Sequence, residues 1–202
     1  RLLIMARKKD PELNEQRRAN ILQSAARIFQ EKGFHGARTE EICAAAEISP
    51  GTLFRYFPDK RSIIQAIVEL EFAKYESDVL RLANKGGLYW LMQLRGDDLL
   101  ALIHPSACNL YADSWLELAR DPLRGPQLLA LDSELRRTMT ERLEAGKTEG
   151  WVRPSVNASG ATNIIFAIFT GLIVDQQQGI RIEADATAVA LGDVLRSILV
   201  TP

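Results

Sequence analysis

The sequence predicts an all-α protein of about nine helices, with an N-terminal three-helix domain followed by a larger C-terminal helical bundle. Apolar residues recur at helical spacing in most segments, and capping or helix-breaking residues separate these segments. No segment shows the alternating pattern of a convincing strand, and there are no internal repeats. With 202 residues, 47% of them hydrophobic, the chain is long enough to bury a core in one large or two small domains.

The first predicted helix begins at Asp10-Pro11 and ends at Gly33, because glycine readily adopts the left-handed conformation that terminates a helix. Phe34 is expected to fill the small core behind it. Residues 1–13, with the basic cluster Arg7-Lys8-Lys9, are expected to form a flexible arm. This arm is either a solvated tail or a segment that reaches a phosphate or the minor groove. One side of the helix is apolar: Leu13, Ile21, Leu22, Ala25, Ile28 and Phe29.

Residues 38–57 predict two short helices joined by a tight turn. Thr39 is expected to cap the first of them through its hydroxyl, and Ser49-Pro50 is a typical start for the second. Leu53 and Phe57 lie one helical turn apart and face inward. Such a pair of helices forms a helix-turn-helix, whose second helix fits the DNA major groove. The outward face of that helix is expected to carry Pro50, Gly51, Thr52, Arg55 and Tyr56.

A long helix is predicted from about Asp59 to Asn84, and the segment Asn84 to Gly87 breaks it. At about 25 residues this helix would span roughly 38 Å, which is long enough to link a DNA-binding head mechanically to the rest of the chain. Shorter helices are expected after it, and the penultimate one is the most apolar. Their expected ranges are 88–94, 97–103, 106–120, 125–149, 156–178 and 183–199.

Charge is distributed unevenly along the chain. Residues 1–62 hold 12 Lys and Arg and 8 Asp and Glu, a net charge of +4, whereas residues 63–202 hold 13 and 18, a net charge of −5. The total of −1 therefore hides a basic N-terminal part on an acidic body. This asymmetry gives modest support to a nucleic-acid-binding head, since the positions of the charges matter more than their sum.

Composition argues against several other classes of protein. Cys43 and Cys108 lie far apart without metal-type spacing and are expected to be reduced thiols in a cytoplasmic protein, with no metal or cofactor. No run approaches the roughly 20 consecutive apolar residues of a membrane span, and the apolar start is too short for a signal peptide. The only histidines are His35 and His104, and no catalytic triad, paired carboxylates or phosphate-binding glycine loop is present, so an enzyme is not expected.

From Ile21 to Val68 the chain resembles the DNA-binding domain of the TetR family of transcriptional regulators. Residues 106–200 resemble, with lower specificity, the ligand-binding and dimerisation part of that family, in the group that includes betaine-type repressors. The resemblance implies a DNA-binding domain at residues 14–62 and a ligand-binding and dimerisation domain at residues 63–202. The N-terminal landmarks are Ala25, Phe29, Gly33-Phe34, Ile42, Ala46, Ile48-Ser49, Gly51-Thr52-Leu53, Tyr56-Phe57 and Lys60. The C-terminal ones are Ala119-Arg120-Asp121-Pro122, Gly150-Trp151-Val152-Arg153-Pro154 and Gly171-Leu172.

The resemblance implies a homodimer that places two copies of the second short helix in adjacent major grooves of a palindromic operator. Three residues depart from the family pattern. Phe54 replaces a tyrosine whose hydroxyl touches phosphate, Glu47 replaces the turn glycine, and Arg38 replaces a small hydroxyl residue. Glu47 implies either a different turn or a tolerated backbone strain of roughly 1 kcal/mol. The implied DNA-binding residues are Arg38, Thr39, Ser49, Pro50, Gly51, Thr52, Phe54, Arg55, Tyr56 and Lys60.

The resemblance also implies that a small organic effector releases the protein from the operator, and it implies an effector pocket and a dimer interface. The expected effector pocket is Trp90, His104, Cys108, Tyr111, Trp115, Phe166 and Phe169. The expected dimer interface is Ala161, Ile165, Ile168, Leu172, Ala188, Leu191 and Leu195. The alternative for the second set is that both apolar stripes are internal core only. Alternatives for the whole protein are a helical carrier of lipophilic ligands and a non-specific DNA-binding protein on the same scaffold.

Overall fold

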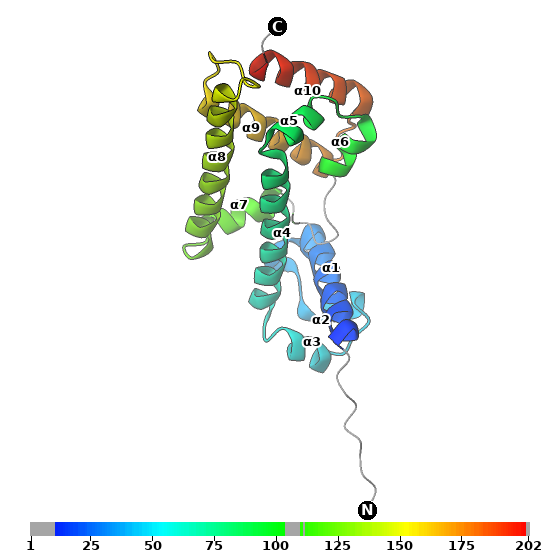
Figure 1. The fold of residues 1–202 in the computed structure, drawn as a ribbon. Coiled ribbons are helices and arrows are strands. Elements are labelled where there is room, and N and C mark those ends of the chain that lie inside the picture. Colours follow the sequence, from blue (N-terminus) through cyan, green and yellow to red (C-terminus); the bar gives the residue numbers. More distant parts are fainter. Residues whose placement is uncertain (1–10, 104–109, 111, 201–202) are drawn as a thin grey trace, which may run out of the picture. The chain divides into compact units, whose positions relative to one another are not determined.

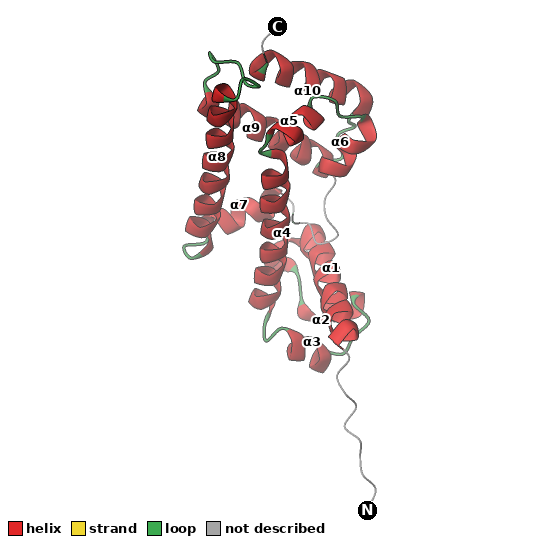
Figure 2. Cartoon of the chain, viewed as in Figure 1, coloured by secondary structure: helices red, strands yellow, loops and turns green. Residues whose placement is uncertain are grey.

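The structure, a computed structural model, describes residues 11–103, 110 and 112–200. All regular elements in this part of the chain are helices, so the all-α prediction is confirmed, with ten helices rather than about nine (Figures 1 and 2). The chain divides into two compact units, residues 1–71 with 107–110, and residues 72–106 with 111–202. The division falls within the fourth helix, after Glu71.

The first unit contains α1 (Pro11–Gly36), α2 (Thr39–Ala45), α3 (Pro50–Tyr56) and the first turns of α4 (Lys60–Leu82). As the sequence predicts, Gly33 interrupts α1: its φ of 67° kinks the helix. The ring of Phe34 then lies edge-on to that of Phe29, with 5.2 Å between centroids, and so fills the core. The core is built from Ile21, Leu22, Ala25, Phe29, Phe34, Ile42, Leu53, Phe57, Ile63 and Ile67, whereas Leu13 is 40% exposed.

The second unit contains the rest of α4 and six further helices, and its core is one continuous apolar cluster. Helix α8 packs against α7 and α9, and α10 packs against α5, α6 and α9. Gly192 lets α10 approach the end of α5, because a Cβ at this position would lie 2.5 Å from the carbonyl oxygen of Met92. The six helices are α5 (Lys85–Leu91), α6 (Gly96–Ile103), α7 (Ala112–Arg120), α8 (Arg124–Thr148), α9 (Ala158–Gln177) and α10 (Ala184–Leu199).

The segment between α4 and α5 is shorter than the sequence predicts, because α5 already begins at Lys85. Asn84 caps α5 directly, since its side chain accepts a hydrogen bond of 3.0 Å from the backbone N–H of Gly87. A Cβ on Gly87 would lie 2.6 Å from the Cα of Leu82, so only glycine allows α5 to start this close to α4. Asn84, which was expected to break the long helix, therefore follows the end of α4 at Leu82 and caps the next helix.

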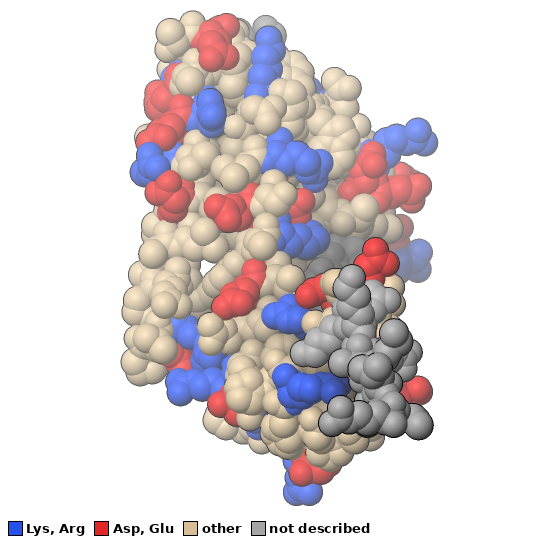
Figure 3. Space-filling view, turned by 60° about the horizontal axis from the view of Figure 1, so that its bottom comes forward, with Lys and Arg blue, Asp and Glu red and all other residues tan. Residues whose placement is uncertain are grey.

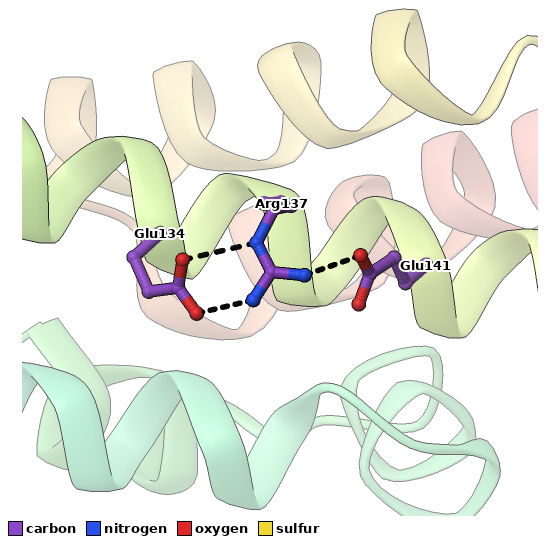
Figure 4. Close-up of polar contacts among 3 residues, drawn as sticks. All are labelled: Glu134, Arg137 and Glu141. Carbon is purple, nitrogen blue, oxygen red and sulfur yellow. Dashed lines mark hydrogen bonds and ion pairs between the residues drawn. The ribbon is translucent and has the colours of Figure 1, made fainter.

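Helix α8 has few buried residues for its 25-residue length, and charged side chains support its exposed face. Arg137 donates from Nε to Glu134 at 3.0 Å and also pairs with Glu141, so the three side chains form a ladder along the helix (Figure 4). These neighbours raise the pKa of Arg137 and lower that of Glu134. Pairs at this spacing stabilise an exposed helix modestly.

One described helix, α9, is long and apolar enough to cross a membrane by length and composition, although the sequence shows no unbroken apolar run of that length. Only 28% of its most apolar 18-residue window is buried within the chain. Core helices of soluble proteins have the same length and composition, so these two properties do not identify a membrane span. In this chain, α9 carries apolar surface that the chain itself does not cover.

Candidate nucleic-acid interface

The turn between α2 and α3 is held in a strained conformation. Glu47 has φ of 55°, the left-handed region that favours glycine, so the backbone tolerates the strain and keeps the turn of the family pattern. The end of α2 is fixed to α1, since the Asn20 side-chain amide donates to the carbonyl of Ala46 at 3.0 Å. This turn sets the angle at which α3 leaves α2.

The start of α3 is as the sequence predicts. Ser49 caps the helix, because its Oγ accepts the backbone N–H of Thr52 at 3.2 Å, and Pro50 takes the first helical position. Leu53 is fully buried and Phe57 is 4% exposed. The inward side of α3 is therefore locked, and its other side faces solvent.

The cap of α2 differs from the prediction. Arg38 occupies the cap position, and Thr39 is the first residue of the helix, with its hydroxyl 3.4 Å from the carboxylate of Glu40. Glu41 instead reaches back and accepts the backbone N–H of Arg38 at 3.0 Å, because a glutamate at the third helical position has the length to do so. Hydrogen bonds from Lys32 and from this N–H lower the pKa of Glu41.

Gly51 lies in the middle of the solvent-facing side of α3. A Cβ built on it would meet nothing within 4 Å, and its φ is not positive. Neither the backbone conformation nor the packing of this chain therefore requires glycine here, although glycine is among the weakest helix formers. A residue without a side chain at an exposed, open position is what close approach by an external surface requires.

The remaining predicted residues of α3 surround Gly51. Pro50, Phe54 and Arg55 are exposed, whereas Thr52 and Tyr56 are half-buried. The guanidinium of Arg55 lies 5.7 Å from the centre of the Tyr56 ring, which holds this cation at the edge of the exposed face. The structure thus brings all the predicted α3 residues together around one open glycine.

Lys60 is placed differently from the prediction that it binds a phosphate. Its Nζ donates to the carbonyl oxygens of Phe34 and Ala37, at 2.6 and 3.0 Å. These carbonyls lie at and just beyond the end of α1, where helix carbonyls lack partners along the chain, and a cation suits this negative end. In this structure Lys60 joins the start of α4 to the end of α1.

Replacing Lys60 with methionine is expected to lower the free energy of unfolding by about 1–3 kcal/mol, because two charge-assisted hydrogen bonds to carbonyls are lost. Urea unfolding monitored by circular dichroism measures this change. Arg27→Met removes the same charge from an exposed position on α1 and serves as the control. If the Lys60→Met protein has unchanged stability, the hydrogen bonds from Lys60 to Phe34 and Ala37 do not stabilise the fold. Lys60 would then again be a candidate for phosphate contact.

On the face drawn in Figure 3, Lys and Arg side chains alternate with Asp and Glu, and wide uncharged areas separate them, so the described residues of this face form no single basic patch. The sequence of the first unit holds 12 Lys and Arg and 10 Asp and Glu, a net charge of +2, because Glu69 and Glu71 add to the 8 acidic residues of residues 1–62. The basic cluster of the predicted arm, Arg7-Lys8-Lys9, lies outside the described residues.

The predicted effector pocket is only partly described, because His104, Cys108 and Tyr111 lie outside the described residues. The other aromatic residues have different partners: Trp115 lies 5.3 Å from Phe72 and Phe166 lies 6.3 Å from Tyr75, between ring centroids. Arg136 lies 4.5 Å above the Phe166 ring, and Phe169 packs against the core. Trp90, with Arg81 over its ring, lines a separate open groove of about 220 Å³ together with Lys74, Asp78, Asp98, Ala101 and Leu102.

The predicted dimer residues are mostly part of the chain's own core. Ala161, Ile165, Ala188, Leu191 and Leu195 are each at most 4% exposed, so their side chains are not available to a partner. Ile168 and Leu172 are partly buried against the same core. These five side chains therefore pack inside this chain, as the internal-core alternative expects. Other apolar residues of α9 and α10 are exposed, and five of them are named here the outer stripe: Ile164, Ala167 and Gly171 of α9, and Val189 and Val194 of α10.

Sequence reasoning missed Glu71, on α4. Its Oε1 accepts the backbone N–H of Leu110 at 2.7 Å, and its Oε2 is buried without a hydrogen-bond partner. Burial raises the pKa of this carboxyl group to about 8, so the group is mostly protonated at neutral pH. The available signal was a glutamate that lies one helical turn after the buried apolar residues Ile67 and Val68 and so shares their face of the helix.

Comparisons with known proteins point to a family of transcriptional regulators. Residues 21–67 match the profile of the family described as "Bacterial regulatory proteins, tetR family". The HTH-type transcriptional regulator UidR of Escherichia coli K12 is 27% identical over 166 residues, covering 78% of this chain and 80% of UidR. Both matches are to transcriptional regulators and not to enzymes. The similarity of the C-terminal part to betaine-type repressors is not among these findings and remains a prediction.

Two solved structures share the fold. A TetR transcription regulator from Haloarcula marismortui superposes with a TM-score of 0.64 at 17% identity, covering 93% of this chain and 100% of that one. The transcriptional regulator FadR from Bacillus subtilis, solved in complex with stearoyl-CoA, gives 0.63 at 14% identity, covering 87% and 96%. At such identities the likeness establishes the fold alone.

Proposed function

This chain belongs to the TetR family of bacterial transcriptional regulators, and from this we propose that it is a cytoplasmic repressor that binds a palindromic operator as a homodimer. A small organic effector, bound in the second unit, releases it. The exposed side of α3 around Gly51 carries the proposal, because an open glycine in a helix that gains nothing from it internally indicates contact with DNA.

The outer stripe supports the dimer. Gly171 lies within α9, has no positive φ, and a Cβ on it would meet nothing within 4 Å. Ile164, Ala167 and Gly171 lie three or four residues apart and so share one face of the helix. On α10, Val189 is 60% exposed and Val194 39%. An exposed apolar face that includes a glycine suits a partner helix at close approach, and a palindrome requires a two-fold partner.

Two observations support an organic effector. The FadR relative was solved with stearoyl-CoA, which shows that this fold accommodates an acyl compound in at least one protein. In the present chain, α4 runs from the first unit into the second as one continuous helix, so a ligand that favours one conformation of the second unit has a direct mechanical link to the DNA-binding helices.

The function is tested by selecting DNA from a random pool with the purified full-length chain. The expected result is a palindromic consensus bound with strong salt dependence, because phosphate contacts release counterions. Titration of the bound complex with acyl-CoA compounds, followed by fluorescence anisotropy, then tests the effector class. Selection of no consensus would reject the operator-binding function and favour the lipophilic carrier or the non-specific DNA-binding protein.

Gly51→Ala separates the two roles of this residue. We expect the free energy of unfolding to stay the same or rise by up to about 1 kcal/mol, because alanine favours the helix and meets no neighbour. Affinity for the selected operator is expected to fall, since the methyl group occupies the space of the approaching DNA. Thermal unfolding and anisotropy measure the two effects, and an unchanged affinity would contradict contact at Gly51.

A further inference from the structure

The exposed side of α3 is more apolar than a surface that must read DNA by hydrogen bonds would need to be. Phe54 is 49% exposed, and Pro50 and Gly51 beside it offer no side-chain donor or acceptor. The inward side of the same helix is filled by Leu53, so Phe54 contributes nothing to the core on that side. An exposed aromatic ring at the centre of a DNA-facing helix calls for an apolar target on the DNA.

Thr52 adds to this apolar character, because its hydroxyl is already engaged. Its Oγ1 lies 3.0 Å from Ser49 Oγ, the same oxygen that caps α3 by accepting the Thr52 backbone N–H. Reading a base through this hydroxyl would compete with the helix cap. The methyl group of Thr52 takes no part in the cap, so an apolar contact through it would leave the cap intact.

The hydrogen-bonding inventory of α3 is small. Its sequence, PGTLFRY, contains neither asparagine nor glutamine, the side chains that pair with adenine in the major groove. Arg55 is its one cation and is suited to guanine or to a phosphate. A·T pairs, however, present a second feature in the major groove, the C5-methyl group of thymine, and apolar side chains read it.

We propose that Phe54 and Thr52 determine specificity by contacting thymine methyl groups, so that each operator half-site presents at least one thymine to this face. The inference rests on the proposed operator-binding function and specifies the DNA that it recognises. Helical geometry places Phe54 and Thr52 on opposite flanks of the Gly51 position, one turn or less apart along the axis. Close approach at Gly51 thus brings both flanks toward the bases.

The test uses the full-length protein and the palindrome that it selects from a random pool. Each thymine of the half-site is replaced in turn by deoxyuridine, which removes the methyl group and keeps every hydrogen-bonding atom of the base pair. At a contacted position we expect affinity to fall about fourfold per half-site, and about fifteenfold when both half-sites are changed, the effect of one buried methyl group at each. Fluorescence anisotropy measures the affinities.

Variants assign each contact to its side chain. Phe54→Ala is expected to abolish the deoxyuridine effect at one position, whereas Phe54→Leu, which keeps an apolar side chain, retains most of it. Thr52→Ser removes the methyl and keeps the hydroxyl beside Ser49, so it should abolish the effect at a second position, while Thr52→Val should preserve it. Circular dichroism confirms that the variants fold, as exposure of Phe54 predicts.

The outcomes separate this inference from the proposed function. A selected palindrome whose affinity is unchanged by deoxyuridine at every position overturns methyl readout and leaves the operator-binding function intact. The same holds if the deoxyuridine effect persists in both Phe54→Ala and Thr52→Ser. Failure to select any palindrome overturns both. A position-specific loss that disappears with one variant and survives in its matched control supports the assignment.

Discussion

Gly171→Arg is expected to convert the proposed dimer into a monomer and to lower operator affinity by about 10²- to 10⁴-fold, because each DNA-binding head then binds its half-site without the effective concentration that its partner provides. The substitution places a long charged side chain on the outer stripe, at its C-terminal end on α9. Within the subunit it should be tolerated, because a Cβ at this position has no neighbour within 4 Å and the position is exposed. Size-exclusion chromatography with light scattering and anisotropy on the selected operator measure the two effects.

The control is Ser159→Arg, which adds the same charge to an exposed position in the first turn of α9 and off the outer stripe. It should leave both the mass and the affinity unchanged. A Gly171→Arg protein that remains dimeric would place the interface elsewhere. A Gly171→Arg protein that is monomeric and still binds the palindrome at full affinity would contradict the proposal that the protein binds its operator as a two-fold dimer.

Glu71→Gln is expected to stabilise the protein at neutral and alkaline pH. The pKa of the Glu71 carboxyl is raised from its ordinary 4.5 to about 8 in the folded chain, so between these values the folded state binds more protons than the unfolded state. The free energy of unfolding therefore falls as pH rises through this window. Glutamine resembles the protonated carboxyl and does not ionise, which should add on the order of 2–3 kcal/mol at pH 7.

Urea unfolding at a series of pH values from 5 to 9 measures this difference, where the range is set by the ordinary and the raised pKa of Glu71. The gain from Glu71→Gln should be small near pH 5 and grow toward pH 8. Glu69→Gln, at an exposed carboxylate on the same helix, should show no such growth. A gain that is the same at every pH would mean that Glu71 is not buried as a neutral acid.

The helix-turn-helix was predictable because its signals are local. Ser49-Pro50 starts α3 by a cap and a proline that need no distant partner, and Gly33 interrupts α1 through its own backbone freedom. Leu53 and Phe57 show the inward face by their spacing alone, and the exposed side of α3 follows from it. Even the strain at Glu47 was visible as a departure from a glycine pattern.

Contacts between distant segments were the point at which prediction failed. Lys60 meets the carbonyls of Phe34 and Ala37, which lie more than twenty residues away, and nothing in the sequence near Lys60 indicates this. At the start of α2 the error was local: the helix begins one residue earlier than expected, so Thr39 is inside it and Glu41 accepts the backbone N–H of Arg38. Glu71 was missed because the group that meets its carboxyl, the backbone N–H of Leu110, lies 39 residues away.

By itself, the sequence determined the all-α class, the helix-turn-helix and the side of α3 that faces away from the core, because helical periodicity and caps act over a few residues. Only the tertiary structure decided which apolar residues of α9 and α10 are internal. Ile165 and Leu195 are buried in their own chain, while Ile164 and Val194, next to them in sequence, remain exposed. A periodic pattern specifies that a helix has an apolar side, but which neighbour covers that side depends on how the helices pack.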